Sequence, residues 1–444
     1  MRDRAFPRPW LIALVLLVVA GACAGPIGQV GSPRVGSSPT AESSASNSPA
    51  ASGTNIASAA PSAPTGTANP ADQATYAQIE TQVQTLRDLK ATQAVNPVLL
   101  DSAGVASYLS KINAAETNHT AMADESRLLI DMGMLPPGSN LEQMELALDS
   151  GQVIGFYDPK SKGLYVLSQS GGVGAAEKIT FAHEFTHALQ DQHFGLDKLQ
   201  TDAADQADRD LARTALPEGD ATLSMTQWAI RYMTAADLLA VANDPASLQQ
   251  TQQLQQSPPI LREELMFPYQ QGLAFVQQVY ASGGWAAVDK LYASPPDSTS
   301  QILHPEQYTN RVRPVALEVP QVIGLLDWKL TMEDTFGEFQ LGIWLAGLTD
   351  KNTGADQAVA HWAGDRVGLY EGPNGGWAVV VNTIWRTQQG ADDFDAAAKT
   401  LVSQLGVQAR VCATANSTGM HPQSEEVILA SDKAALDLLA PCAG

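Results

Sequence analysis

The stretch FAHEFTHALQDQHFG, at residues 181–195, contains three of the seven histidines of this 444-residue chain. His183 and His187 are four residues apart, and Glu184 directly follows the first of them. On a helix this spacing corresponds to about 40° of rotation, so both imidazoles project from one face. Two histidines and a carboxylate within one helical turn predict two ligands for Zn²⁺ and a general base for hydrolysis.

The third metal ligand has two candidates. His193 is placed as the last histidine of the metzincin pattern HExxHxxGxxH, but the glycine that turns the chain out of the helix is replaced by Gln190. Glu218 follows Pro217, which is typical of the first turn of a helix. On such a helix Glu218 lies on an apolar face, and a buried carboxylate requires an opposite charge. We therefore predict Glu218 as the third ligand and keep His193 as the alternative.

The elements that must position these residues follow from apolar periodicity. It predicts a helical N-terminal subdomain over residues 74–150 and a mainly helical core over residues 151–310. A β-hairpin is predicted just before the HExxH helix, because VIGFYDPKSKGLYVLSQ places turn-forming residues between two apolar runs. Residues 156–166 of this hairpin would either bind a peptide by strand addition or be purely structural.

A smaller α/β subdomain is predicted over residues 311–444. The runs VGLYEG and WAVVVNTIW flank PNGG and predict a second hairpin. A helix at 392–405, a strand around 427–429 and a last helix at 433–439 complete this part. The predicted fold class is therefore α+β.

The N-terminus carries an export signal. Three arginines precede an apolar run at residues 10–22, which is shorter than the roughly 20 residues that span a membrane. We interpret residues 1–23 as a signal peptide whose AGAC end resembles a lipobox. The protein is then either anchored on the outer face of the cell membrane by a lipid on Cys23 or secreted. Residues 24–73 are rich in Ser, Ala, Pro and Gly and are predicted to be a disordered tether.

Charge and cysteine content limit the partners. The formal net charge of −21 argues against nucleic acid as a partner, and contact with a membrane is expected only through Cys23. Cys412 and Cys442 form an even pair once Cys23 is set aside. In an oxidising compartment they predict a disulfide, with two unrelated thiols as the alternative.

A family resemblance follows from these motifs. The HExxH motif with a later glutamate in LPEGDA resembles the gluzincin, or thermolysin-like, zinc metallopeptidases. AHEFTHALQDQHF, EGDA and STSQILHPEQY together resemble an uncharacterised family of bacterial secreted or lipoprotein metallopeptidases over residues 150–440. The resemblance implies a zincin-like catalytic core. Many gluzincins carry an aspartate four residues after the ligand glutamate, but Thr222 stands there, so Asp191 is the candidate for orienting a histidine.

The chemistry implied is hydrolysis of a peptide or protein substrate. Zn²⁺ lowers the pKa of bound water, and Glu184 takes a proton and passes it to the leaving amine. A further donor must stabilise the oxyanion; His304 is the first candidate, followed by Tyr269 and Tyr308.

Two other functions compete with the peptidase. One is a zinc hydrolase of non-peptide substrates, and the other is a binding lipoprotein with a structural zinc site. Structural sites are closed by four protein ligands, so ligation by both His193 and Glu218 would argue against catalysis.

Overall fold

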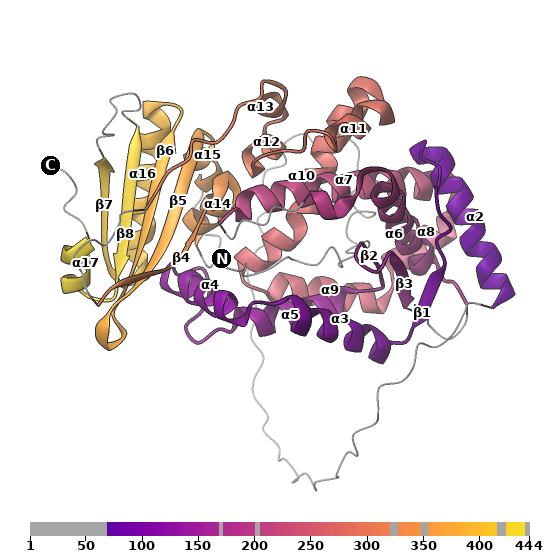
Figure 1. Cartoon of the computed structure of the whole chain (residues 1–444), viewed down its shortest axis with the longest axis horizontal. Helices are drawn as coiled ribbons and strands as arrows, with labels where there is room; N and C mark the ends of the chain where they lie inside the picture. Colours follow the sequence, from indigo (N-terminus) through magenta and orange to yellow (C-terminus); the bar gives the residue numbers. More distant parts are fainter. Residues whose placement is uncertain are drawn as a thin grey trace, which may run out of the picture.

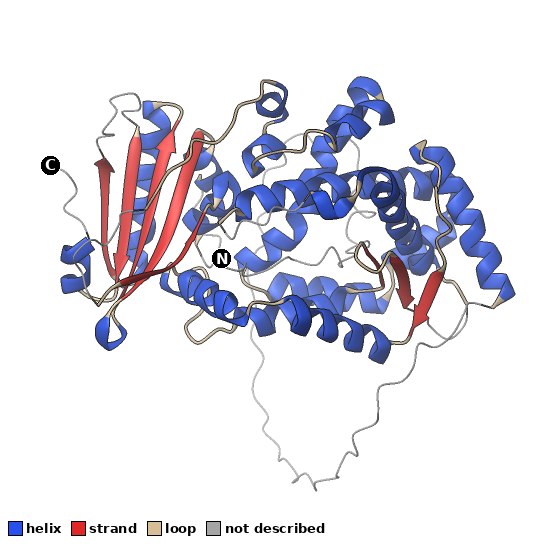
Figure 2. Ribbon diagram, viewed as in Figure 1, coloured by secondary structure: helices blue, strands red, loops and turns tan. Residues whose placement is uncertain are grey.

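The computed structural model describes residues 69–167, 172–199, 205–319, 327–347, 354–414 and 423–439. Across these residues the protein is α+β and mainly helical, with two sheets at opposite ends of its long axis (Figures 1 and 2). The predicted signal peptide and nearly all of the predicted tether lie outside the described residues. Helix α2 begins at Pro70 and not at the predicted boundary of 74, because Asn69 caps it by accepting hydrogen bonds from Ala71 and Asp72 N–H groups.

The N-terminal and central part of the chain contains the smaller sheet and most of the helices. Its elements are α2 (Pro70–Arg87), β1 (Pro97–Leu100), α3 (Ser102–Glu116), α4 (His119–Asp131), α5 (Leu141–Gln152), β2 (Gly155–Asp158), β3 (Gly163–Leu167), α6 (Ala175–Phe194), α7 (Ala207–Tyr232), α8 (Ala235–Ala242), α9 (Pro245–Gln256), α10 (Pro259–Gly283), α11 (Trp285–Leu291), α12 (Thr299–Leu303) and α13 (Pro305–Thr309).

The smaller sheet has the strand order β1-β3-β2. Strands β2 and β3 are antiparallel, which confirms the predicted hairpin, and β1 runs parallel to β3. Strand β2 is therefore an edge strand, and it contacts α6. The hairpin and the HExxH helix thus form one packed unit.

Helix α6 carries the HExxH motif and buries both of its faces. Phe181 and Phe185 pack against α2, where the ring of Tyr76 lies 4.5 Å from that of Phe181. Gly195 ends the helix in the left-handed region, with φ of 71°. The apolar face thus anchors α6, while its histidines face α7.

Helix α7 differs from the prediction. It begins at Ala207, so Pro217 lies in its interior and not in its first turn. An interior proline costs about 3 kcal/mol because it removes one helical hydrogen bond. The turns on both sides of Pro217 are buried, and their packing outweighs that cost.

Helices α7 and α10 cross at two glycines. A Cβ added to Gly219 would lie 2.2 Å from the carbonyl carbon of Gly272, and one added to Gly272 would lie 2.2 Å from the carbonyl oxygen of Ala215. The two backbones are therefore in direct contact at this crossing. Gly219 directly follows Glu218, so the crossing sets how closely α10 approaches the predicted ligand.

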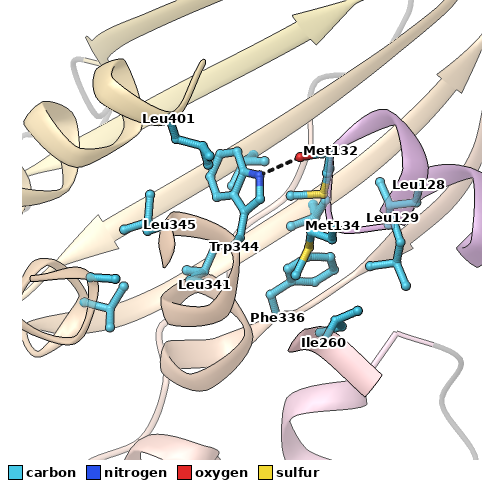
Figure 3. Packing of buried hydrophobic residues seen from close by; sticks show 14 of the residues in the cluster. Leu128, Leu129, Met132, Met134, Ile260, Phe336, Leu341, Trp344, Leu345 and Leu401 are labelled. Carbon is cyan, nitrogen blue, oxygen red and sulfur yellow. Dashed lines mark hydrogen bonds between the residues drawn. The ribbon is translucent and has the colours of Figure 1, made fainter. Parts of the chain in front are cut away.

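Residues 74–150 are divided among three apolar clusters, one of which joins α3 to β1 and β2. Helix α2 packs with α6 and α7, whereas the residues of α4 and α5 join the cluster of the C-terminal sheet. Figure 3 shows the cluster shared with the C-terminal sheet, where Trp344 Nε1 donates a hydrogen bond to the carbonyl of Met132 at 3.0 Å. The helices predicted as one subdomain therefore pack on two parts of the molecule, the part around α6 and the smaller sheet and the part around the C-terminal sheet.

The C-terminal sheet is antiparallel throughout, with the strand order β4-β5-β6-β8-β7. One face packs against α4, α14 and α16, and the other against α17 and Val319. Its elements are β4 (Lys329–Asp334), α14 (Gly337–Ala346), α15 (Ala355–Val359), β5 (Trp362–Glu371), β6 (Trp377–Trp385), α16 (Gln388–Leu405), β7 (Gln408–Thr414), β8 (Ser424–Ala430) and α17 (Lys433–Leu439).

Most of the C-terminal prediction holds. The hairpin corresponds to β5 and β6, the strand around 427–429 to β8, and the two helices to α16 and α17. Strands β4 and β7 and helices α14 and α15 were not predicted. Cys412 is disulfide-bonded, while its predicted partner Cys442 lies outside the described residues. None of the described helices is long and apolar enough to cross a membrane.

The glycine crossing yields a stability prediction. Gly219→Ala places a methyl group inside the backbone of Gly272, so α7 and α10 must separate. We expect the free energy of unfolding to fall by about 2–3 kcal/mol, as for other overpacked sites, in urea denaturation of the metal-free protein.

Gly342→Ala in α14 is the matched control. Its Cβ would lie 3.4 Å from Val359 Cγ2 and 3.9 Å from Asp356 Oδ1, and alanine favours a helix by about 0.5–1 kcal/mol over glycine. Equal unfolding free energies for Gly219→Ala and the wild type would contradict the proposed contact.

Candidate metal centre

Three predicted ligands meet in the interior between α6 and α7. His183 Nε2 lies 3.0 Å from His187 Nε2 and 3.1 Å from Glu218 Oε2. His187 Nε2 lies 3.3 Å from the same carboxylate oxygen. All three side chains are at most 3% exposed. The structure therefore brings the three residues together, one turn of α6 supplying both imidazoles and α7 the carboxylate.

This geometry fits a metal ion. Ligand atoms at about 2.0–2.2 Å from a tetrahedral Zn²⁺ are separated by about 3.3 Å from one another, close to the three distances here. Within the described ranges, this is the only group of three or more histidine, cysteine or acidic side chains close enough to share a metal ion. The group could hold a metal with three protein ligands and a fourth position left open.

The electrostatics of the metal-free site are those of a buried ion pair. Burial alone would lower the pKa of His187, but the adjacent Glu218 carboxylate raises it above its usual value. Burial would likewise raise the pKa of Glu218, but the charge of His187 and the hydrogen bonds of both histidines lower it. Burial lowers the pKa of His183. The chain therefore offers a neutral imidazole, a carboxylate and one imidazole that must lose a proton.

Glu184 lies beside this group with its two oxygens in different environments. Its Oε2 accepts a hydrogen bond from the backbone N–H of Tyr157 at 2.8 Å. Its Oε1 is buried and has no hydrogen-bond partner among the described residues. Burial raises the pKa of the carboxyl group to about 8. One oxygen is therefore held by strand β2, and the other is available to a reactant.

The β2–β3 hairpin is fastened to α6 by Asp191. This buried carboxylate accepts hydrogen bonds from Tyr157 Oη at 2.7 Å and from Lys162 Nζ at 2.8 Å. The prediction that Asp191 orients a histidine is therefore wrong, since its oxygens are directed to the hairpin and to the N–H of Leu196. A peptide strand could add to β2 at Tyr157 only by displacing Glu184 from the N–H group.

A second buried carboxylate follows Glu218 on α7. Asp220 accepts two hydrogen bonds from Arg87, at 2.6 and 2.9 Å, and one from Tyr292 Oη at 2.7 Å. Arg87 also bonds Asp289 and lies 4.3 Å from the ring centroid of Trp285. This network ties α2 and α11 to α7 two residues beyond the predicted ligand.

Tyr269 is brought to the site by the helix crossing. It precedes Gly272 by nearly one turn of α10, and its ring centroid lies 6.1 Å from that of His183. The side chain is buried. It is the nearest of the three predicted oxyanion donors to the ligand group.

The other predicted residues lie elsewhere. His304 Nε2 is 2.7 Å from Glu338 Oε1, and its helix α12 is held to Asp208 through the N–H of Thr299. Asp208 precedes Glu218 by about 15 Å along α7, so no contact joins His304 to the ligands. Tyr308 Oη donates to the carbonyl of Ser294, and the exposed His193 bonds the carbonyl of Lys90.

Sequence reasoning missed three groups around the site. They are the backbone N–H of Tyr157, the Arg87 guanidinium and the amide of Gln190, which lies against His187. Of these three, only Gln190 could have been noticed in the sequence, because it replaces the glycine of the HExxHxxGxxH pattern.

In comparisons with known proteins, the part of the chain with a match is the region of the C-terminal sheet. Residues 328–432 match the model of a domain of unknown function (DUF8575). The matched region runs from β4 to the end of β8 and does not include the ligand group. No curated protein and no solved structure matches the chain.

The ligand geometry predicts the metal content of two variants. The wild type should retain about one Zn²⁺ per chain after incubation with the ion and gel filtration, measured by elemental analysis. Glu218→Ala should lose the ion because it removes one of three ligand atoms. His193→Ala, the matched control, should keep it, because His193 bonds only the carbonyl of Lys90. Loss of zinc from His193→Ala alone would refute this ligand set.

Proposed function

We propose that the protein is a zinc-dependent peptidase with a zincin-like catalytic core. The observation that carries this proposal is the pairing of a three-residue group with Glu184, whose Oε1 is buried beside it without a hydrogen-bond partner among the residues that the structure describes. A purely structural site has no use for such an atom, and leaving a polar atom buried and unpaired costs about 1–3 kcal/mol.

The donor set supports zinc in particular. Two imidazoles and one carboxylate are a ligand set of catalytic zinc sites, which leave the fourth position for water, whereas structural sites are closed by four protein ligands. The described part of the chain supplies no fourth ligand. When bound, Zn²⁺ would lower the pKa of water and polarise the scissile carbonyl group.

The chain's own groups supply the proton transfers. Glu184 Oε1 accepts the proton of the attacking water and returns it to the leaving amine. The N–H of Tyr157 holds Oε2 and so fixes the plane of the carboxylate. The hairpin is rigid at this point because Asp191 binds both Tyr157 and Lys162.

Tyr269 is assigned to the oxyanion. A phenol donates one hydrogen bond, and the ring lies beside His183 on a helix whose position is set by backbone contact. His304 is less suited, because Glu338 occupies its Nε2. The substrate class is peptides or proteins. The predicted signal peptide and the lipobox-like AGAC end at Cys23 support action outside the cytoplasm, either membrane-anchored or secreted.

The peptidase proposal is tested by Glu184→Gln. The amide cannot accept a proton, so cleavage of a quenched fluorescent peptide library should fall by about 10²–10⁴-fold, while the zinc content stays near one per chain. Glu177→Gln, in the first turn of the same helix, should retain full activity. Undiminished cleavage by Glu184→Gln would exclude this mechanism, and a zinc-loaded wild type that cleaves no peptide would exclude the peptidase.

Zinc affinity should depend on pH. The Glu218 carboxylate raises the pKa of His187 in the metal-free protein, so at neutral pH this imidazole carries a proton that zinc must displace. The affinity should therefore fall as pH falls, by up to about tenfold per unit. Competition with a chromophoric chelator at pH 6, 7 and 8, corrected for the titration of the chelator, measures it. A flat profile would show that His187 is already neutral.

A further inference from the structure

Gln190 is a buried polar residue between the two helices that carry the ligands. It stands one turn after His187 on α6 and is 0% exposed. Its Oε1 lies 2.8 Å from His187 Nδ1, and its Nε2 donates a hydrogen bond to the carbonyl of Pro217 at 3.0 Å. Both polar ends of the amide are therefore engaged, one by a ligand and one by the residue before Glu218.

The direction of this amide follows from its partners. A backbone carbonyl only accepts hydrogen bonds, so the NH₂ group of Gln190 must face Pro217 and Oε1 must face His187. Since Oε1 only accepts, His187 must donate from Nδ1. In the neutral ring the lone pair then lies on Nε2, which is the atom that faces His183 Nε2 and Glu218 Oε2.

The same amide links the two ligand-bearing helices. His187 belongs to α6, while Pro217 directly precedes Glu218 on α7. Gln190 thus joins the ring of one ligand to the backbone beside another. His183 has no equivalent support, because its Nδ1 is buried without a hydrogen-bond partner in the described part of the chain. Of the two imidazoles, only that of His187 is oriented by a hydrogen bond at Nδ1.

We infer that Gln190 is the positioning residue of the metal centre, which selects the ligating tautomer of His187 and sets its separation from Glu218. This inference rests on the proposed function only in requiring that the site bind a metal ion. The position that departs from the HExxHxxGxxH pattern thereby acquires a role of its own.

The test compares zinc affinity among three variants of the full chain, by competition with a chromophoric chelator. Gln190→Met removes the acceptor at similar volume and should weaken binding by about 10- to 100-fold, as for other residues that orient metal ligands. Gln190→Glu keeps an acceptor for Nδ1 but loses the donor to the carbonyl of Pro217, so it should bind zinc less tightly than the wild type and more tightly than Gln190→Met. The absorption spectrum of bound Co²⁺ should change more with Gln190→Met than with Gln190→Glu.

Gln192→Met is the matched control on the same helix. Gln192 also uses both ends of its amide, accepting from the N–H groups of Thr92 and Gln93 and donating to the carbonyl of Gln93. These bonds lie away from the ligands, so its loss should leave zinc affinity unchanged. Circular dichroism and thermal unfolding of the metal-free variants show whether each one folds.

The outcomes separate this inference from the peptidase proposal. Wild-type affinity in Gln190→Met, or equal losses in Gln190→Met and Gln190→Glu, would overturn the positioning role while leaving the metal site intact. If Gln190→Met does not fold, Gln190→Glu decides the matter alone, and loss of zinc from that variant overturns the inference. A wild type that binds zinc without cleaving peptide would refute only the proposed function, and one that binds no zinc would refute both.

Discussion

Two imidazoles and a carboxylate meet in the interior of this protein, and burying them is the constraint on which the surrounding structure depends. An isolated charge in such a place costs far more than a folded domain can supply. The cost is offset here by pairing, since Glu218 lies within 3.3 Å of both histidines. This pairing requires that α6 and α7 keep a fixed position relative to each other, since the histidines lie on α6 and Glu218 on α7. The apolar face of α6, which packs with Met225 and Trp228 of α7, and the Gln190 amide both hold the two helices together.

The same turn of α7 carries a second buried charge that faces away from the first. Asp220 forms an ion pair with Arg87 and accepts a hydrogen bond from Tyr292, and it is not paired with the histidines. Removing either partner of such a pair would leave an uncompensated charge, which costs about 3–5 kcal/mol. One short stretch, PEGDA, therefore combines the predicted ligand Glu218, a direct backbone contact with α10 and an ion pair to α2.

Sequence reasoning succeeded where the chemistry is local and failed where partners are distant. The HExxH spacing places two ligands on one helical turn, and the apolar stripe around Glu218 correctly predicted that the carboxylate points inward. The start of α7 was missed because Pro217 looks like a first-turn residue, and only tertiary packing makes it tolerable inside a helix. His304 was favoured for its motif, but its partner Glu338 lies on α14, beyond any local pattern. Residues 74–150 look like one helical unit because periodicity does not reveal which cluster each helix joins.

The division of those helices has a consequence for how the chain acquires its structure. Trp344 and Met132, which form a hydrogen bond within the cluster shared with the C-terminal sheet, are 212 residues apart. Contacts of such separation form slowly, because a long loop must close before they are gained. As the chain is synthesised, α4 and α5 appear long before the sheet that covers their apolar sides. Until the region matched by the family model has been synthesised, the apolar sides of α4 and α5 that face the sheet stay uncovered, and without these helices part of one face of the sheet stays uncovered.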